Sequence, residues 1–132
     1  MVENIELKVL VLGNSFTHQH LKLCLETSNF DVTYLTQCLE ALERLRSGRF
    51  NIALVEGWHA EALRACREIY SGKLIPVALL VRSPDLNWQN YGSWQVDGFI
   101  TEESTSLELI ARMKAIARRP VSANASLLRC AS

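Results

Sequence analysis

The residues of this chain that could do chemistry stand in four short polar clusters, each of which follows an apolar run. The clusters begin at Gly13, Glu56, Arg82 and Glu102. Two carboxylates, Glu56 and Glu102, would face each other across the strand ends, and such a pair costs energy unless one group is protonated or a cation intervenes. His59 could pair with Glu56 at the mouth of such a site. The sequence holds no phosphate-binding loop, nucleophile elbow or dinucleotide fingerprint, so we do not expect an enzyme.

The pattern of apolar residues predicts the elements that position these clusters. The predicted strands are 8–12, 30–35, 51–55, 76–81 and 96–100. The predicted helices include 18–26, 38–45, 60–70 and 107–119, the last preceded by a capping box of Thr105 and Glu108. Since strands and helices alternate, we expect a parallel sheet with right-handed crossovers and helices on both faces. The four clusters would then meet at the carboxyl ends of the strands, where such sheets carry their sites.

Composition limits the class of protein. The 132 residues fit one domain, and 14 basic residues balance 14 acidic ones, so no overall field attracts nucleic acid or an anionic membrane. The N-terminus lacks the features of a signal peptide and no apolar run is long enough to span a membrane, so we expect a cytoplasmic protein. The cysteines lie far apart without metal-ligand spacing and are expected to be reduced and mostly buried; they are Cys24, Cys38, Cys66 and Cys130.

The order and spacing of these landmarks resemble the receiver domain of two-component response regulators over residues 8–119. The resemblance rests on KVLVL at 8–12, EAL at 40–42, FNIALVE at 50–56, IPVALLV at 75–81 and VDGFIT at 96–101. It implies an α/β fold of the flavodoxin-like (CheY-like) type, a three-layer sandwich with a five-stranded parallel sheet in the order 2-1-3-4-5 and five helices.

The end of the chain indicates a subtype. ELIARMKAIARR at 108–119 is similar to the last receiver helix of the OmpR/PhoB type, whose members continue through a linker into a winged-helix DNA-binding domain. We therefore expect residues 1–119 to form the receiver-like domain. Residues 120–132 would be the linker towards a DNA-binding domain that this sequence does not include.

The residues that would carry the family's chemistry are replaced. Such a receiver transfers a phosphoryl group from a histidine kinase to its own aspartate, with Mg²⁺ held by acids. Here Gly13 and Asn14 stand in place of the acidic pair, so the main protein ligands of Mg²⁺ are missing. Glu56 aligns with the phosphoacceptor but is one methylene longer, which displaces its carboxylate beyond the tolerance of in-line transfer. No cofactor is expected.

Three further positions of the family's switch also depart from its pattern. Val81 stands in place of the hydroxyl residue, Glu102 in place of the lysine, and Phe99 has the ring of the switch aromatic without a hydroxyl. The resemblance therefore predicts a pseudo-receiver that does not use aspartyl phosphorylation. Arg82 could bridge Glu56 and Glu102 in a permanent ionic cluster; alternatively, all three side chains point into solvent.

Dimerisation is the expected output of the domain. In the OmpR/PhoB type, dimers form through the fourth helix, fifth strand and fifth helix, and Asp97, Glu108 and Arg112 match positions of that interface, whereas Gly98 replaces its second acid. Glu108 and Arg112 could instead form an ordinary pair on one helix. An aromatic cluster of Trp88, Tyr91 and Trp94 could add a dimer contact, or two of its rings could pack inward.

These features favour a phosphorylation-independent regulatory domain of an OmpR/PhoB-type transcription regulator that acts as a homodimer, with DNA bound by the absent domain. Two alternatives stay open. In the first, the emptied phosphorylation pocket is a sensor site for a small ligand or a protein partner, lined by Gly13, Asn14, Glu56, Val81 and Arg82. In the second, Glu56 itself accepts a phosphoryl group, which the missing Mg²⁺ ligands disfavour.

Overall fold

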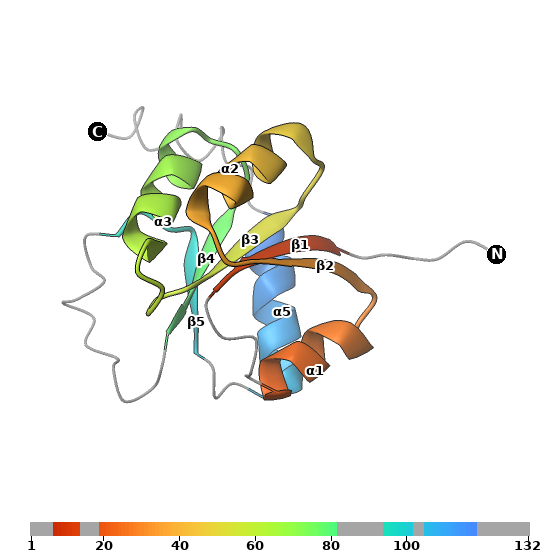
Figure 1. The fold of residues 1–132 in the computed structure, drawn as a ribbon. Helices are drawn as coiled ribbons and strands as arrows, with labels where there is room; N and C mark the ends of the chain where they lie inside the picture. The colour runs from red at the N-terminus through yellow and green to blue at the C-terminus, as the bar shows by residue number, and fades with distance from the viewer. Residues whose placement is uncertain (1–6, 14–18, 82–93, 102–104, 119–132) are drawn as a thin grey trace, which may run out of the picture.

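The computed structural model describes residues 7–13, 19–81, 94–101 and 105–118 of the chain (Figure 1). Five parallel strands form one sheet in the order β2-β1-β3-β4-β5, which confirms the predicted topology. The strands are β1 (Leu7–Leu12), β2 (Phe30–Leu35), β3 (Ile52–Glu56), β4 (Val77–Val81) and β5 (Gly98–Thr101). The three central strands are almost entirely buried, as expected for short apolar runs covered on both faces.

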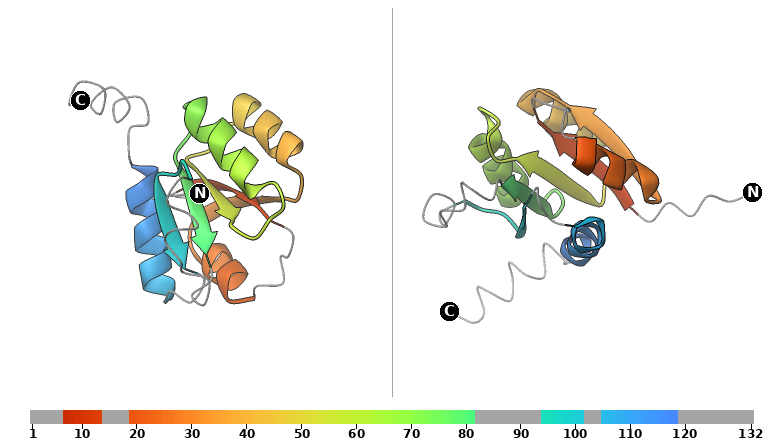
Figure 2. Two further views of the ribbon diagram at one scale, coloured as in Figure 1. Left: turned by 90° about the vertical axis from the view of Figure 1, so that its left-hand side faces the viewer. Right: turned by 90° about the horizontal axis from the view of Figure 1, so that it is seen from below.

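Helices cover both faces of the sheet, as predicted (Figures 1 and 2). The described helices are α1 (Gln19–Thr27), α2 (Cys38–Ser47), α3 (Ala62–Ser71) and α5 (Ser106–Ala117). Pairs α1 with α5 and α2 with α3 each enclose one hydrophobic core, and alternate residues of every central strand point into one core or the other. The remaining expected helix, before β5, falls in residues 82–93, outside the described part of the chain.

Local chemistry explains where α5 and α3 begin. At α5, the Thr105 hydroxyl accepts a hydrogen bond from the Glu108 N–H (3.2 Å) while the Glu108 carboxylate accepts one from the Thr105 N–H (3.2 Å), which confirms the capping box. Helix α3 begins at Ala62 rather than at the predicted residue 60. The preceding residues form a turn instead, in which the His59 N–H donates to the Glu56 carbonyl (3.0 Å).

Helix α5 packs directly against β5, and Gly98 faces Ile116 at this contact. A Cβ atom at Gly98 would lie 2.6 Å from Cδ1 of Ile116, a distance that real side chains do not tolerate. A side chain at position 98 would therefore require the Ile116 side chain to shift. None of the described helices is long and apolar enough to cross a bilayer.

Candidate functional site

The carboxyl ends of β1 and β3 bring Gly13 and Glu56 together. Leu12 pairs with Val55 in the parallel register, so the next residues, Gly13 and Glu56, are also neighbours. Main-chain hydrogen bonds hold both positions: the Gly13 N–H donates to the Leu35 carbonyl (3.0 Å), and the N–H after Glu56 donates to the Leu80 carbonyl (2.8 Å). The sheet edge that was predicted to collect the polar clusters therefore places these two residues side by side.

Glu56 fills the space that a side chain on Gly13 would occupy. A Cβ atom built on Gly13 would overlap the Glu56 carboxyl group and lie 2.8 Å from its Cγ. Glu56 is only 1% exposed, although it is the last residue of its strand. The alternative in which the Glu56 side chain points into solvent is therefore wrong for this residue. The longer carboxylate and the missing side chain at position 13 are complementary in shape.

The other predicted site residues are placed as follows. Val81 ends β4, is fully buried, and belongs to the core between the sheet and the α2–α3 layer. Phe99 is half-buried against the same core. Asn14, Arg82 and Glu102 lie outside the described residues, so the ionic cluster of Glu56, Arg82 and Glu102 stays a prediction.

His59 has a different partner from the one that the sequence suggested. Its ring is 7% exposed, and Nε2 lies 2.8 Å from the carbonyl of Thr36, in the loop before α2. Its Nδ1 accepts a hydrogen bond from the Glu61 N–H (2.9 Å), so Nε2 carries the proton and donates to Thr36. The predicted pair with the Glu56 side chain is replaced by this bridge, which joins the loops that precede α2 and α3.

The buried thiols near this bridge are held in their protonated form. Burial raises the pKa of Cys66 to about 12, with a smaller contribution from neighbouring Cys38. Burial also raises the pKa of Cys38, and the carboxylate of Glu61 adds to this effect. Cys24, Cys38 and Cys66 are all buried and none of them is in a disulfide, which confirms the expected burial of the described cysteines.

The described part of the site does not suit Mg²⁺. This ion needs several oxygen ligands in near-octahedral geometry. Gly13 offers no side chain, and the carboxylate of Glu56 fills the space beside Gly13. Among the described residues, no group of three or more His, Cys, Asp or Glu side chains is arranged to hold a metal ion.

The residues predicted for the dimer face divide into two groups. Glu108 and Arg112 are exposed on α5, as an interface would require, although Glu108 also closes the capping box. Asp97 instead holds the sheet together, because its carboxylate accepts a hydrogen bond from the Val77 N–H (2.8 Å) at the start of β4. Trp94 is half-buried against the core under α3, in line with the inward alternative for this ring. Trp88 and Tyr91 lie outside the described residues.

Sequence reasoning missed the neighbouring apolar residues on the exposed face of α5. Leu107, Ala111 and Ala115 follow one another at intervals of four residues, and all three are exposed. Leu107 is the most exposed large hydrophobic residue of the described chain, at 82%. The spacing could have identified this row, since residues four apart share a helix face.

Comparison with solved structures identifies the class of fold. The receiver domain of the Francisella response regulator 1452 has a TM-score of 0.70 at 19% identity, covering 86% of this chain and 98% of that one. A CheY-like receiver domain protein from Methanospirillum hungatei JF-1 has a TM-score of 0.68 at 14% identity, covering 83% and 92%. The receiver domain of sensor histidine kinase PA1611 from Pseudomonas aeruginosa PAO1 has a TM-score of 0.69 at 13% identity, covering 86% and 98%, and holds a magnesium ion in its active-site cleft.

These similarities show that the chain has the fold of CheY-like response regulator receiver domains. A scan against protein-family models gives no match, and a search of curated protein sequences gives none either.

Proposed function

We propose that the chain is the receiver-like regulatory domain of an OmpR/PhoB-type transcription regulator, and that it works without aspartyl phosphorylation. The observation that carries this proposal is the burial of the Glu56 carboxylate over Gly13. An acceptor for in-line phosphoryl transfer must be open to the donor and close to a metal that neutralises the developing charge. A carboxylate that is 1% exposed, beside a glycine that offers no metal ligand, meets neither condition.

In this proposal, homodimerisation through β5 and α5 replaces phosphorylation as the regulated event. The apolar row Leu107, Ala111 and Ala115 would form the centre of the contact, with the charges of Glu108 and Arg112 beside it. About a two-fold axis, the same patch meets itself, so Glu108 of each protomer can face Arg112 of the other. The charge pair would give register and specificity more than affinity. DNA binding would belong to a domain beyond the linker at residues 120–132, in a cytoplasmic protein.

Sedimentation velocity over a concentration series, without phosphodonor or metal, tests the dimer. We expect a reversible dimer that Arg112→Glu weakens by about tenfold or more, because the reversal places two acids side by side on each half of the contact. Arg46→Glu is the matched control, since Arg46 is an exposed arginine on α2, on the opposite face of the sheet. A monomer at every concentration, or equal effects of the two reversals, would exclude dimerisation through this face.

Intact-mass measurement after incubation with acetyl phosphate and Mg²⁺ tests the lost chemistry separately. We expect no phosphoryl adduct under conditions that label an active receiver domain. An adduct mapped to Glu56 would overturn the proposal and restore the phosphotransfer alternative. The sensor alternative requires an open pocket, and the burial of Glu56 over Gly13 disfavours it.

A further inference from the structure

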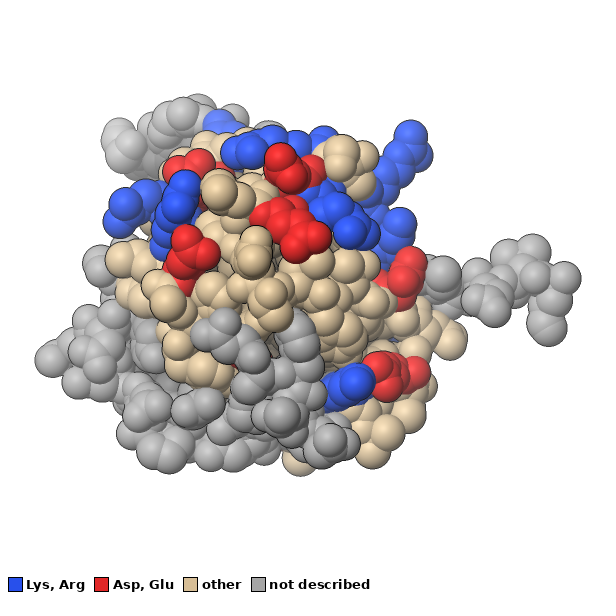
Figure 3. All heavy atoms as spheres, viewed as in Figure 1, with Lys and Arg blue, Asp and Glu red and all other residues tan. Residues whose placement is uncertain are grey.

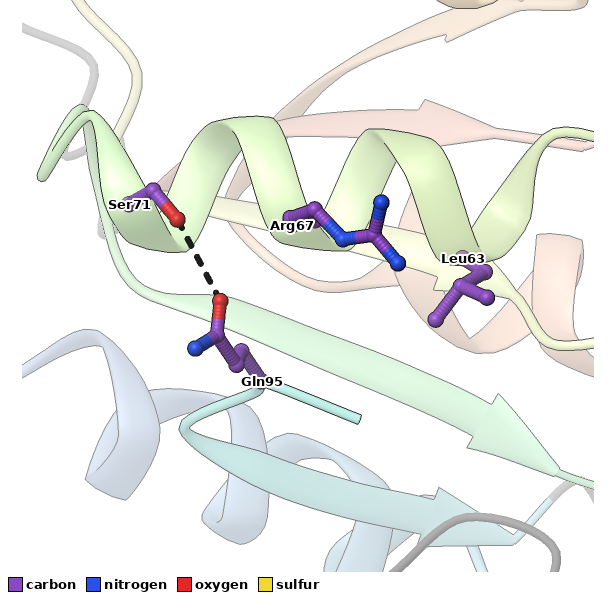
Figure 4. Close-up of a pocket in the computed structure, with 4 residues that line it drawn as sticks. All are labelled: Leu63, Arg67, Ser71 and Gln95. Atoms are coloured by element: carbon purple, nitrogen blue, oxygen red, sulfur yellow. Dashed lines mark hydrogen bonds between the residues drawn. The ribbon is translucent and has the colours of Figure 1, made fainter. Parts of the chain in front are cut away.

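A groove runs along α3 on the side that faces the segment leading into β5 (Figure 4). Its volume is about 400 Å³, within the range of small-ligand sites. Among the described residues, its lining consists of Leu63, Arg67 and Ser71 from α3 and Gln95 from the opposite wall. We call this feature the α3 groove. Gly13 and Glu56 are not part of it.

The lining residues form an ordered row. Leu63, Arg67 and Ser71 are spaced by four residues, so they share one face of α3 and extend over about 12 Å of helix. At one end, the Ser71 hydroxyl donates a hydrogen bond to Oε1 of Gln95 (3.2 Å), which ties the two walls together (Figure 4). At the other end, Leu63 is 41% exposed and offers an apolar surface.

Arg67, in the middle of the row, is an exposed cation, and no hydrogen bond or ion pair engages it within the described part of the chain. Arg64, one turn earlier on another face of α3, does have a partner, since its guanidinium lies 3.6 Å from the carboxylate of Glu61. The amide nitrogen of Gln95 is a second donor, because Oε1 already accepts the bond from Ser71. The groove therefore presents an apolar end, a central guanidinium and an amide donor.

The selectivity of the groove for an acidic ligand must come from the placement of its side chains, because no general positive field surrounds it. Basic and acidic side chains are mixed over α2 and α3 (Figure 3), and the whole chain has no net charge. A guanidinium binds a carboxylate through two parallel hydrogen bonds, which is a directional interaction. Adjacent positions of the α3 row are about 6 Å apart, close to the distance between alternate side chains of an extended peptide.

We propose that the α3 groove docks a short acidic segment of a protein partner in an extended conformation. An apolar side chain of the segment packs on Leu63, and a carboxylate two positions away pairs with the guanidinium of Arg67, which extends towards Leu63 (Figure 4). The row is long enough for three or four extended residues. This inference goes beyond the proposed function and does not depend on it, because the groove lies on the α3 side of the sheet and the proposed dimer face on α5.

Fluorescence anisotropy on the full chain tests the groove, with the fluorescein-labelled peptide Leu-Ser-Glu-Ser as the probe. We expect saturable binding below ~1 mM, and a loss of about ten- to hundredfold in affinity for Arg67→Ala, as for a hydrogen-bonded charge. Arg46→Ala removes an exposed arginine from α2 and should change the affinity less than about twofold. The same peptide with Gln in place of Glu, or with Ser in place of Leu, should bind more weakly.

Four results would overturn the docking proposal. The first is the absence of saturable binding at ~1 mM. The second is an equal loss for Arg67→Ala and Arg46→Ala, which would indicate nonspecific attraction. The third is an effect of Arg67→Ala on self-association in sedimentation velocity without any effect on peptide binding, which would assign the groove to a second copy of this chain. Amide shifts in NMR titration should map to Leu63, Arg67 and Gln95, and a map on α5 would equally exclude this site.

Discussion

The fit between Gly13 and Glu56 predicts a measurable coupling of their substitutions. Gly13→Ala should destabilise the fold, because the new Cβ would overlap the buried carboxyl group and lie 2.8 Å from Cγ of Glu56. Overpacking of this kind costs about 1–3 kcal/mol. The backbone itself tolerates alanine, since no described glycine has a positive φ. For a domain of this size, we expect a decrease in Tm of about 4 °C for each kcal/mol.

Removing the Glu56 side chain should abolish the cost of the alanine. In the Glu56→Ala background, Gly13→Ala should be neutral or stabilise the protein by about 0.4–1 kcal/mol, because alanine restricts the unfolded chain. A double-mutant cycle, measured by urea unfolding, should therefore give a coupling energy of about 1–3 kcal/mol between positions 13 and 56. The cycle does not depend on the separate effect of Glu56→Ala.

Gly98→Ala provides the matched control for this cycle. Its Cβ would also meet a buried side chain, but that side chain is Ile116 at the packing contact between β5 and α5. We expect Gly98→Ala to lose a similar amount of stability, and Glu56→Ala should not restore it. The coupling energy between positions 98 and 56 should lie within about 0.5 kcal/mol of zero. A coupling between positions 13 and 56 that is equally close to zero would refute the reasoning.

Three further predictions concern pH and the loop bridge. Hydrogen bonds from Thr105 lower the pKa of Glu108, so the ionised carboxylate stabilises the fold above the usual pKa of 4.5, and this stability is lost as the pH falls below that value. Glu108→Gln can keep the capping box but does not titrate, so it should flatten this part of a plot of urea midpoint against pH. The pKa of Cys66 is raised from 9.0 to about 12, so stability should decline as the pH rises through that interval, and Cys66→Ala should reduce the decline. His59→Ala should cost about 1–3 kcal/mol in urea unfolding, because it removes both hydrogen bonds of the ring; an unchanged midpoint would mean that the bridge does not hold the two loops.

The fold followed from periodicity because its signals are local and repeated. The apolar run at 30–35 matches β2 at both ends, and the capping box of Thr105 and Glu108 fixed the start of α5 to within one residue. The start of α3 was missed by two residues. The His59 ring bonds the Thr36 carbonyl in the loop before α2 and the Glu61 N–H in its own loop, which holds the chain in a turn there. The bond to Thr36 joins residues far apart in the sequence, and such a contact leaves no periodic trace.

The candidate site was predictable in its location but not in its geometry. The topology rule places Gly13 and Glu56 at the same sheet edge from the strand pattern alone. The burial of Glu56 could not be derived in this way, because it depends on a side-chain conformation and on empty space beside a glycine. The hydrogen bond from the Val77 N–H to Asp97 could not be predicted for a similar reason. The sequence does not show whether a carboxylate will accept a bond from a main-chain N–H or remain exposed.

The packing of Glu56 over Gly13 also determines how readily substitutions could place a pair of metal-binding acids at this edge of the sheet. An acid introduced at position 13 alone would meet the buried Glu56 carboxyl group and destabilise the fold. Shortening Glu56 to aspartate alone would withdraw atoms from a filled space without supplying a metal ligand at position 13. Each of these two substitutions alone therefore destabilises the fold. A metal-binding site at this edge requires both substitutions together. The contact between one glycine and one longer carboxylate acts as an epistatic barrier that separates this sequence from those with an acid at both positions.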